Sequence, residues 1–308
     1  MDNSDLKRLI ENIEKVIVGK QETIKLLITG LLTNGHILIE DVPGTGKTIL
    51  TLALAKSISA DFKRIQFTPD LLPSDVTGGF VYNPKTGEFE PKKGPVFTNI
   101  LLADEINRTT PRTQSALLEC MQEYKVTMDG HTFVLDRPFM VVATENPIEY
   151  QGTYSLPEAQ IDRFLMKINL GYLSIGEEVK VISEQKVQHP IDALKPVIDL
   201  EKVLKLQDMV KSIDVAPNIL DYIVQMVSAT RKRDDIKLGA SPRASISLMK
   251  ASSAWAFLEG RDYVIPDDVI KLLPFVLKHR LILQPKALIS GKTTESVASE
   301  IAKSTPIP

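Results

Sequence analysis

The segment DVPGTGKT, residues 41–48, follows an apolar run and precedes the helical pattern ILTLALAKSI. Gly44 and Gly46 allow successive backbone amides to turn toward one anion, and the next helix presents its N-terminus to the same anion. In such a loop Lys47 reaches the β- and γ-phosphates and the Thr48 hydroxyl ligates magnesium. The pattern predicts a phosphate-binding loop made of Asp41, Val42, Pro43, Gly44, Thr45, Gly46, Lys47 and Thr48.

The loop departs from the usual pattern G-x-x-x-x-G-K-[ST] at one position, because Asp41 stands where the first glycine is expected. The structural alternative is a glycine-rich turn between a strand and a helix that binds nothing. The strand, loop and helix occur in the required order, and this order favours the phosphate loop.

A second motif, ILLADEIN, is an apolar run that ends in two acids, Asp104 and Glu105. At a strand end beside a phosphate loop, one carboxylate can join the magnesium shell while the other orients an attacking water. We assign the metal to Asp104 and the water to Glu105. The alternative is a pair of solvated acids at the start of a loop.

Five short apolar or β-branched runs alternate with helical stretches through about residue 173, as in βαβ units around a mainly parallel sheet. We expect strands at 36–40, 62–67, 100–103, 139–144 and 166–170. Two hairpins interrupt this alternation, at 80–91 and 125–135. In the second, Asp129 and Gly130 favour a type I′ turn.

Beyond residue 174 strand patterns give way to successive helices, with start signals at Asp199, Pro217, Ser241 and Pro266. We therefore divide the chain into an α/β core at 1–175 and a helical domain at 176–308. Pro274 falls within an apolar helical run and should kink or split that helix.

The composition is that of a folded globular protein, with 43% hydrophobic and 25% charged residues in 308. A net charge of −2 gives no field that would favour nucleic acid as a partner. The first residues lack the basic region of a signal peptide, and no apolar run is long enough to span a membrane. The one cysteine, Cys120, fits a reducing compartment. We expect a cytoplasmic protein without membrane insertion.

Several longer strings resemble the MoxR family of AAA+ ATPases. The most specific are RIQFTPDLLPSDVTG, GPVFTNILLADEINR, TQSALLECMQE, ATENPIEYQGTYSLPEAQIDRF and GASPRASI. The resemblance implies a P-loop AAA+ core with a mainly parallel five-stranded sheet, followed by an all-helical lid domain. Asp41 is usual in that family.

The resemblance also implies roles for single residues. Asn146 resembles the sensor-1 residue, Arg163 the arginine finger that acts on a neighbouring subunit's ATP, and Arg243 the sensor-2 residue of the lid. Val18 and Gly19 match the segment that contacts adenine. From the residues alone, Asn146 could form an Asn-Pro turn, Arg163 could pair with Asp162 on the surface, and Ile17-Val18 could simply end the first helix.

Arg243 has an independent argument. In the string SPRAS it occupies the second position of a helix, where the helix dipole disfavours a cation by about 0.3–1 kcal/mol. A nearby anion such as a γ-phosphate would reverse that cost. The alternative is a solvated arginine.

The function implied is an ATP-hydrolysing homo-oligomeric ring, hexameric in most relatives, with ATP and Mg2+ as ligands and Glu105, Asn146, Arg163 and Arg243 as catalytic residues. The family further implies a chaperone for a protein client, with a von Willebrand factor A domain protein as one candidate partner. The alternative is an ATP-switched assembly module with little turnover. A GTPase would need an N-K-x-D string, which the sequence lacks, and a small-molecule kinase would not need Arg163 in trans.

Overall fold

A computed structural model describes residues 4–42, 44–146, 154–184 and 189–308. The core is a five-stranded sheet with the order β2-β5-β8-β1-β9, and every pairing in it is parallel. Its strands are β1 (Ile37–Glu40), β2 (Phe62–Gln66), β5 (Ile100–Asp104), β8 (Met140–Glu145) and β9 (Met166–Ile168). The predicted α/β fold with a parallel five-stranded sheet is confirmed.

Successive strand residues point to opposite faces of the sheet, and both faces are covered. Ile37 and Ile39 belong to an apolar cluster shared with α1 (Ser4–Glu14), α2 (Gln21–Leu32) and α3 (Lys47–Ser57). Leu38 belongs to a second cluster, shared with α4 (Pro73–Thr77) and α5 (Pro111–Glu123). Burial on both faces is why β1, β5 and β8 read as nearly continuous apolar runs, whereas the edge strand β2 keeps exposed polar residues.

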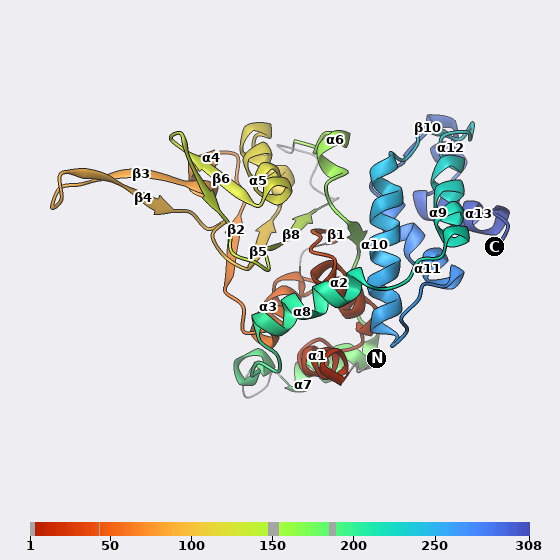
Figure 1. The fold of residues 1–308 in the computed structure, drawn as a ribbon, viewed down its shortest axis with the longest axis horizontal. Helices are drawn as coiled ribbons and strands as arrows, with labels where there is room; N and C mark the ends of the chain where they lie inside the picture. The colour runs from red at the N-terminus through yellow and green to blue at the C-terminus, as the bar shows by residue number, and fades with distance from the viewer. Residues whose placement is uncertain (1–3, 43, 147–153, 185–188) are drawn as a thin grey trace.

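Two hairpins leave this core. The first, β3 (Gly78–Asn83) with β4 (Glu88–Lys93), projects far from the body, as Figure 1 shows. The second pairs β6 (Lys125–Met128) with β7 (His131–Val134). Asp129 and Gly130 both have positive φ, 46° and 83°, as the predicted type I′ turn requires.

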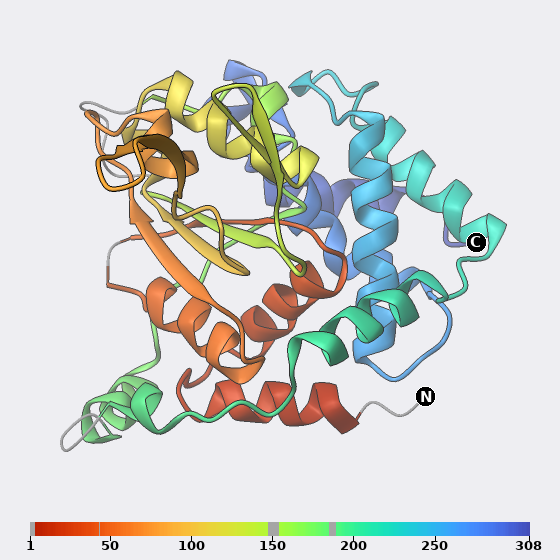
Figure 2. The ribbon, with the colours of Figure 1, turned by 60° about the vertical axis from the view of Figure 1, so that its left-hand side comes forward.

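The remaining helices follow β8, and α10 packs against α2 of the core as well as against α9 and α11 (Figures 1 and 2). They are α6 (Glu158–Ile161), α7 (Ile175–Glu184), α8 (Leu200–Lys211), α9 (Pro217–Ala229), α10 (Pro242–Leu258), α11 (Pro266–Leu277), α12 (Pro285–Ile289) and α13 (Thr294–Ser304), with a short 3-10 turn at Pro190–Ala193. Another 3-10 turn, at Ile106–Arg108, precedes α5. The predicted start signals at Asp199, Pro217, Ser241 and Pro266 are confirmed.

One expectation for this half was wrong, and one of the two alternatives for Pro274 is excluded. A short antiparallel pair, β10 (Ile236–Leu238) with β11 (Ile282–Leu283), lies among the helices, and strands this short leave no period-2 pattern to read. Helix α11 is not split and continues through Pro274 to Leu277. Pro274 has no N–H to bond to the Ile270 carbonyl, and the helix ends within one turn after it, at Leu277.

His36, just before β1, is fully enclosed in the core. Its Nδ1 accepts a hydrogen bond from the Val141 amide at 3.0 Å, so its Nε2 must carry the proton that it donates to the Met121 carbonyl at 2.9 Å. Burial lowers the pKa of His36 from 6.5 to about 4. The fold therefore requires the neutral ring.

This requirement predicts acid sensitivity. The unfolded chain binds a proton at His36 below pH 6.5 and the folded chain does not, so stability is full above pH 6.5 and falls as the pH drops toward 4. We expect His36→Gln to reduce the slope of unfolding free energy against pH by up to about 1.4 kcal/mol per unit. Urea titrations at pH 7, 6 and 5 measure it. Exposed His131→Gln is the control, and an unchanged slope in His36→Gln would contradict the assignment.

Candidate functional site

The predicted phosphate loop connects β1 to α3. Gly44 and Gly46 adopt left-handed φ values of 85° and 90°, and a Cβ on either would meet no atom within 4 Å, so open space lies beside both glycines. The Lys47 ammonium donates to the Asp41 carbonyl at 2.8 Å, and the Thr45 hydroxyl donates to the Val42 carbonyl at 3.2 Å. The loop has the backbone form that an anion site at a helix N-terminus requires. Pro43 lies outside the described residues.

The hydrogen bonds of the Asp41 carboxylate explain why an acid occupies this position of the loop. One oxygen accepts from the Val42 amide at 2.9 Å, and the other accepts from the amides of Leu170 and Gly171 at 2.8 and 2.7 Å. The side chain is buried and anchors the start of the loop to the segment after β9. Asp41 thus supports the loop and does not direct its charge at a phosphate.

The two acids predicted to act lie at the end of β5. This strand pairs with β8, the central strand of the sheet. The Thr144 hydroxyl donates to Asp104 Oδ1 at 2.6 Å and accepts from the Glu105 amide at 2.8 Å. One buried hydroxyl therefore fixes both the Asp104 carboxylate and the backbone at Glu105. Sequence reasoning missed Thr144, although a polar residue inside the apolar run MVVAT is a readable signal.

Both carboxylates already have partners from β2. The Arg64 guanidinium pairs with Asp104 Oδ2 at 2.6 Å, and the Gln66 amide donates to Glu105 Oε2 at 2.6 Å. Arg108 also pairs with Glu105 Oε2, at 2.9 Å. Sequence reasoning missed Arg64 and Gln66, which stand on one face of a strand beside β5. In this arrangement Glu105 is held in place, and it must leave Gln66 and Arg108 to orient water freely.

Asn146 follows the end of β8 and is buried. Because β8 pairs in parallel with β1, Asn146 lies at the same edge of the sheet as the phosphate loop. Beside it, burial raises the pKa of Glu145, and the cation of Lys167 acts in the opposite direction. Lys167 lies 2.5 Å from Glu40 and 3.8 Å from Glu145, so the three side chains form a charged layer under the loop.

Arg163 follows α6 and does not pair with Asp162. Within the described ranges Arg163 has no ion pair, and its buried Nε has no hydrogen-bond partner. It lines a cavity of about 200 Å³ with residues of α5 and α6, namely Ser115, Glu119, Gln122, Glu123 and Gln160. No hydrogen bond or ion pair among described residues joins Arg163 to the phosphate loop of its own chain.

Arg243 lies in the first turn of α10 and keeps 48% of its side chain exposed. Its nearest acid is Asp162, at 3.9 Å. The helix is capped by Ser241, whose hydroxyl accepts from the Arg243 amide at 3.1 Å and donates to Asp162 at 2.9 Å. Asp162 thus offsets part of the dipole cost that the sequence indicated.

Val18 and Gly19 lie between α1 and α2 and face the start of α7. A Cβ on Gly19 would come within 1.8 Å of the Glu177 carboxylate, and Lys20 donates to the Tyr172 carbonyl at 2.8 Å. Ser174 and Glu177 form a capping box there. Glycine at position 19 is favoured by its φ of 70°, whereas the partly exposed Glu177 side chain could move aside for a Cβ.

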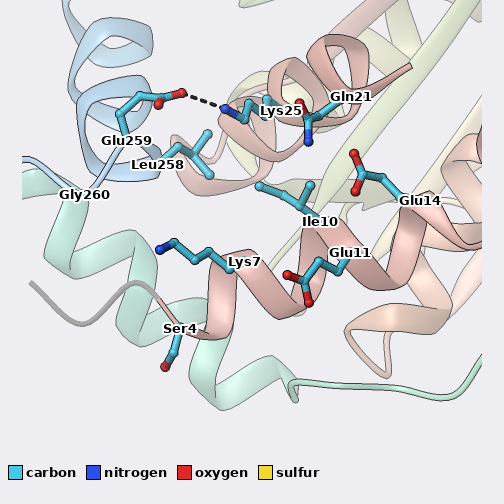
Figure 3. Close-up of a pocket in the computed structure, with 10 residues that line it drawn as sticks. All are labelled: Ser4, Lys7, Ile10, Glu11, Glu14, Gln21, Lys25, Leu258, Glu259 and Gly260. Atoms are coloured by element: carbon cyan, nitrogen blue, oxygen red, sulfur yellow. Dashed lines mark hydrogen bonds and ion pairs between the residues drawn. The ribbon is translucent and has the colours of Figure 1, made fainter. Parts of the chain in front are cut away.

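A larger cavity, of about 850 Å³, lies elsewhere, between α1, α2 and the end of α10 (Figure 3). Acids and lysines of these helices line it, and the pair between Lys25 and Glu259, at 2.8 Å, crosses one side. None of the residues predicted to bind nucleotide borders it.

In the part of the chain described, no group of three acidic, histidine or cysteine side chains could hold a metal, and no helix has the length and apolarity to cross a bilayer.

Comparisons with known proteins identify relatives of this chain in sequence and in structure. Residues 36–166 match the ATPase family associated with various cellular activities (AAA), and residues 228–301 match the AAA lid domain. The chain is 44% identical to chaperone MoxR1 of Mycobacterium tuberculosis over 98% of its own length and 82% of that protein, and 55% identical to YeaC of Bacillus subtilis, covering 98% and 95%. The crystal structure of a proposed ATPase from Cytophaga hutchinsonii superposes with a TM-score of 0.92 at 42% identity, over 99% of this chain and 96% of the other.

The bridging role of Thr144 predicts a specific defect. Thr144→Val keeps the shape and removes the hydroxyl, so stability should fall by only about 1 kcal/mol. The mispositioned acids should lower any ATP turnover by about 10- to 100-fold. Thr113→Val, which removes a buried hydroxyl that is bonded to the Leu71 carbonyl at 2.8 Å and to neither acid, is the control. Equal turnover in the two variants would show that the Thr144 hydroxyl does not position the acids.

Proposed function

This chain belongs to the MoxR family of AAA+ ATPases, and from that premise we propose that it binds ATP with Mg2+ and hydrolyses the nucleotide between subunits of a ring. The observation that carries the proposal is the Thr144 hydroxyl, which holds Asp104 and Glu105 together beside the phosphate loop. Two carboxylates fixed at a strand end next to an anion site suit hydrolysis, where one holds the metal and the other activates water.

The donor chemistry fits magnesium. Mg2+ prefers oxygen ligands and often takes only one or two from the protein, with phosphates and waters supplying the rest. The Thr48 hydroxyl and the Asp104 carboxylate would hold it, once Asp104 exchanges the guanidinium of Arg64 for the metal. When bound, the ion neutralises charge on the β- and γ-phosphates.

The remaining residues divide the work on the nucleotide. Loop amides and Lys47 bind the phosphates, and Val18 and Gly19 border the base. Glu105 takes the proton of the attacking water, and Asn146 orients that water near the γ-phosphate. Arg243 reaches the γ-phosphate from the lid and balances the charge that develops in the transition state.

Arg163 completes the site from a neighbouring subunit. Its lack of a salt-bridge partner within the described chain, and its position beside a surface cavity of α5, support a role outside its own subunit. A contact that joins Arg163 of one copy to the phosphate loop of the next is head-to-tail, and such contacts close into a ring when the rotation between neighbours fits. We propose a hexamer, with the two hairpins at the pore or on a ring face.

The cellular role follows from the relatives by analogy. One relative is named a chaperone, so we propose that ATP turnover drives maturation or activation of a protein client in the cytoplasm, with a von Willebrand factor A domain protein as partner. The core at 1–175 and the lid domain at 176–308 would move against each other during turnover.

A second function is favoured by one observation. Glu105 is bonded to Gln66 and Arg108, and Asp104 to Arg64, so both acids are occupied without nucleotide. If those pairs persist when ATP binds, the protein is an ATP-switched assembly module that hardly turns over.

Two substitutions separate binding from hydrolysis. Lys47→Ala removes the charge opposite the β- and γ-phosphates and should weaken ATP binding by about tenfold or more. Glu105→Gln keeps size and hydrogen bonding but removes the base, so binding should persist while turnover falls by at least about 100-fold. Calorimetry and phosphate release measure the two quantities. Equal loss of ATP affinity in both variants would contradict this division.

Mixed assemblies test the trans role of Arg163. In an equimolar mixture of Arg163→Ala and Glu105→Gln subunits, about one quarter of interfaces combine an intact Glu105 with an intact Arg163, so about that share of turnover should return. The control mixes Lys47→Ala with Glu105→Gln, whose defects lie in the same subunit's site and cannot complement. Sizing must confirm subunit exchange. No recovery in exchanged rings would remove Arg163 from the trans site.

A further inference from the structure

Arg280 is a buried arginine at the boundary between the core and the lid. Its side chain is only 2% exposed, and arginine is rarely buried to this degree without a full set of partners. It follows α11, more than 100 residues from the segment around Arg163 that it contacts. Nothing in the sequence analysis assigned it a role.

The contacts of Arg280 surround Arg163. Its Nη2 donates to the carbonyls of Asp162 and Phe164 at 3.2 and 2.5 Å, and its Nη1 donates to the carbonyl of Leu165 at 3.1 Å. The backbone on both sides of Arg163 is thus fixed by one guanidinium. The same Nη1 also donates to the Val276 carbonyl at 2.5 Å, and Nη2 lies 3.2 Å from the Ser247 hydroxyl, in lid helices α11 and α10, so the two N–H groups of Nη2 are shared among three acceptors.

The Asp162 carboxylate extends the connection to Arg243. Arg280 Nε binds Asp162 Oδ1 at 2.6 Å, while Oδ2 accepts from the Ser241 hydroxyl at 2.9 Å and lies 3.9 Å from Arg243. Ser241 is the cap of α10, the helix that carries Arg243. One carboxylate and one guanidinium therefore join the segment of Arg163 to the helix end of Arg243.

We propose that Arg280 is a positioning residue that holds Arg163 and Arg243 as one unit, so that the lid and the arginine offered to the next subunit move together. The proposal rests on the proposed function, in which both arginines act on γ-phosphates. Replacing a buried ion pair by apolar groups is often neutral or stabilising, so stability alone does not account for the pair. The planar fork of arginine, with five donors, suits simultaneous contact with several carbonyls and a carboxylate, which lysine cannot make.

The test compares Arg280→Lys with a matched control, Arg261→Lys. Arg261 also forms a two-pronged pair with a buried acid, Asp268, at 2.6 and 2.7 Å, but within the lid and away from both arginines. We expect Arg280→Lys to lower kcat by at least about tenfold with ATP affinity changed less than about threefold, because the phosphate loop is untouched. Arg261→Lys should stay within about twofold on both. Normal kcat in Arg280→Lys would overturn the proposal.

Asp162→Asn guards against a folding defect, because it alters the pair without introducing a buried lysine. We expect it to reproduce the loss, and the double variant with Arg280→Lys to lose no more than the worse single one. Losses that multiply in the double variant would show that the two residues act separately and would overturn the proposal.

Hydrogen exchange separates this proposal from the proposed function, because it needs no activity. In Arg280→Lys, exchange should quicken together at the amides of residues 163–165 and in the first turn of α10, and in Arg261→Lys at neither. If wild type releases no phosphate, the proposed function fails, while this paired change still supports the coupling. Faster exchange in only one of the two segments contradicts the coupling whatever the turnover.

Discussion

The parallel pairing of β5, β8 and β1 is the constraint on which the site depends. Parallel strands bring their carboxyl ends to one edge, so the phosphate loop, the two acids and Asn146 meet there although they are far apart in sequence. Thr144 turns this rough proximity into a fixed arrangement, since its hydroxyl bonds to Asp104 and to the Glu105 backbone. The edge is held from the other side by Asp41, which ties the loop to the segment after β9.

This edge is rigid in its backbone and adjustable in its side chains. The two carboxylates are bound by Arg64, Gln66 and Arg108. Each of these polar partners is partly exposed or lies close to the surface. The acids themselves are mostly buried, with 12% and 19% of the Asp104 and Glu105 side chains exposed, so losing a partner without a replacement would cost more than the about 0–1 kcal/mol of an exposed pair, and a metal ion or a nucleotide would supply that replacement. A bound nucleotide and its metal can therefore redirect the acids without disturbing the sheet. The lid is connected differently, through the buried pair between Asp162 and Arg280, which joins it to the segment around Arg163 and resists independent movement of that segment and the lid.

The sequence predicted the five strands, the loop and the acidic pair because each is a local signal: a buried apolar run, glycines before a helix, or acids at a strand end. It predicted the helix starts at Ser241 and Pro266 for the same reason. It could not predict the anchor role of Asp41, the partners of Arg64 and Gln66, or the burial of Arg280, because each depends on residues about 40 to 130 positions away. The β10 and β11 strands escaped notice because two or three residues carry no periodicity. The sequence left open a pair between Arg163 and Asp162. In the structure, Asp162 pairs with Arg280 instead.

The central claim is that a complete site needs two subunits, and the dependence of ATP turnover on protein concentration tests it most directly. Phosphate release per subunit should be measured over a dilution series while sedimentation follows assembly in the same samples with ATP present. The account predicts that turnover per subunit is low where the protein is monomeric, rises with assembly and levels off when assembly is complete. Constant turnover per subunit down to fully monomeric samples would contradict it.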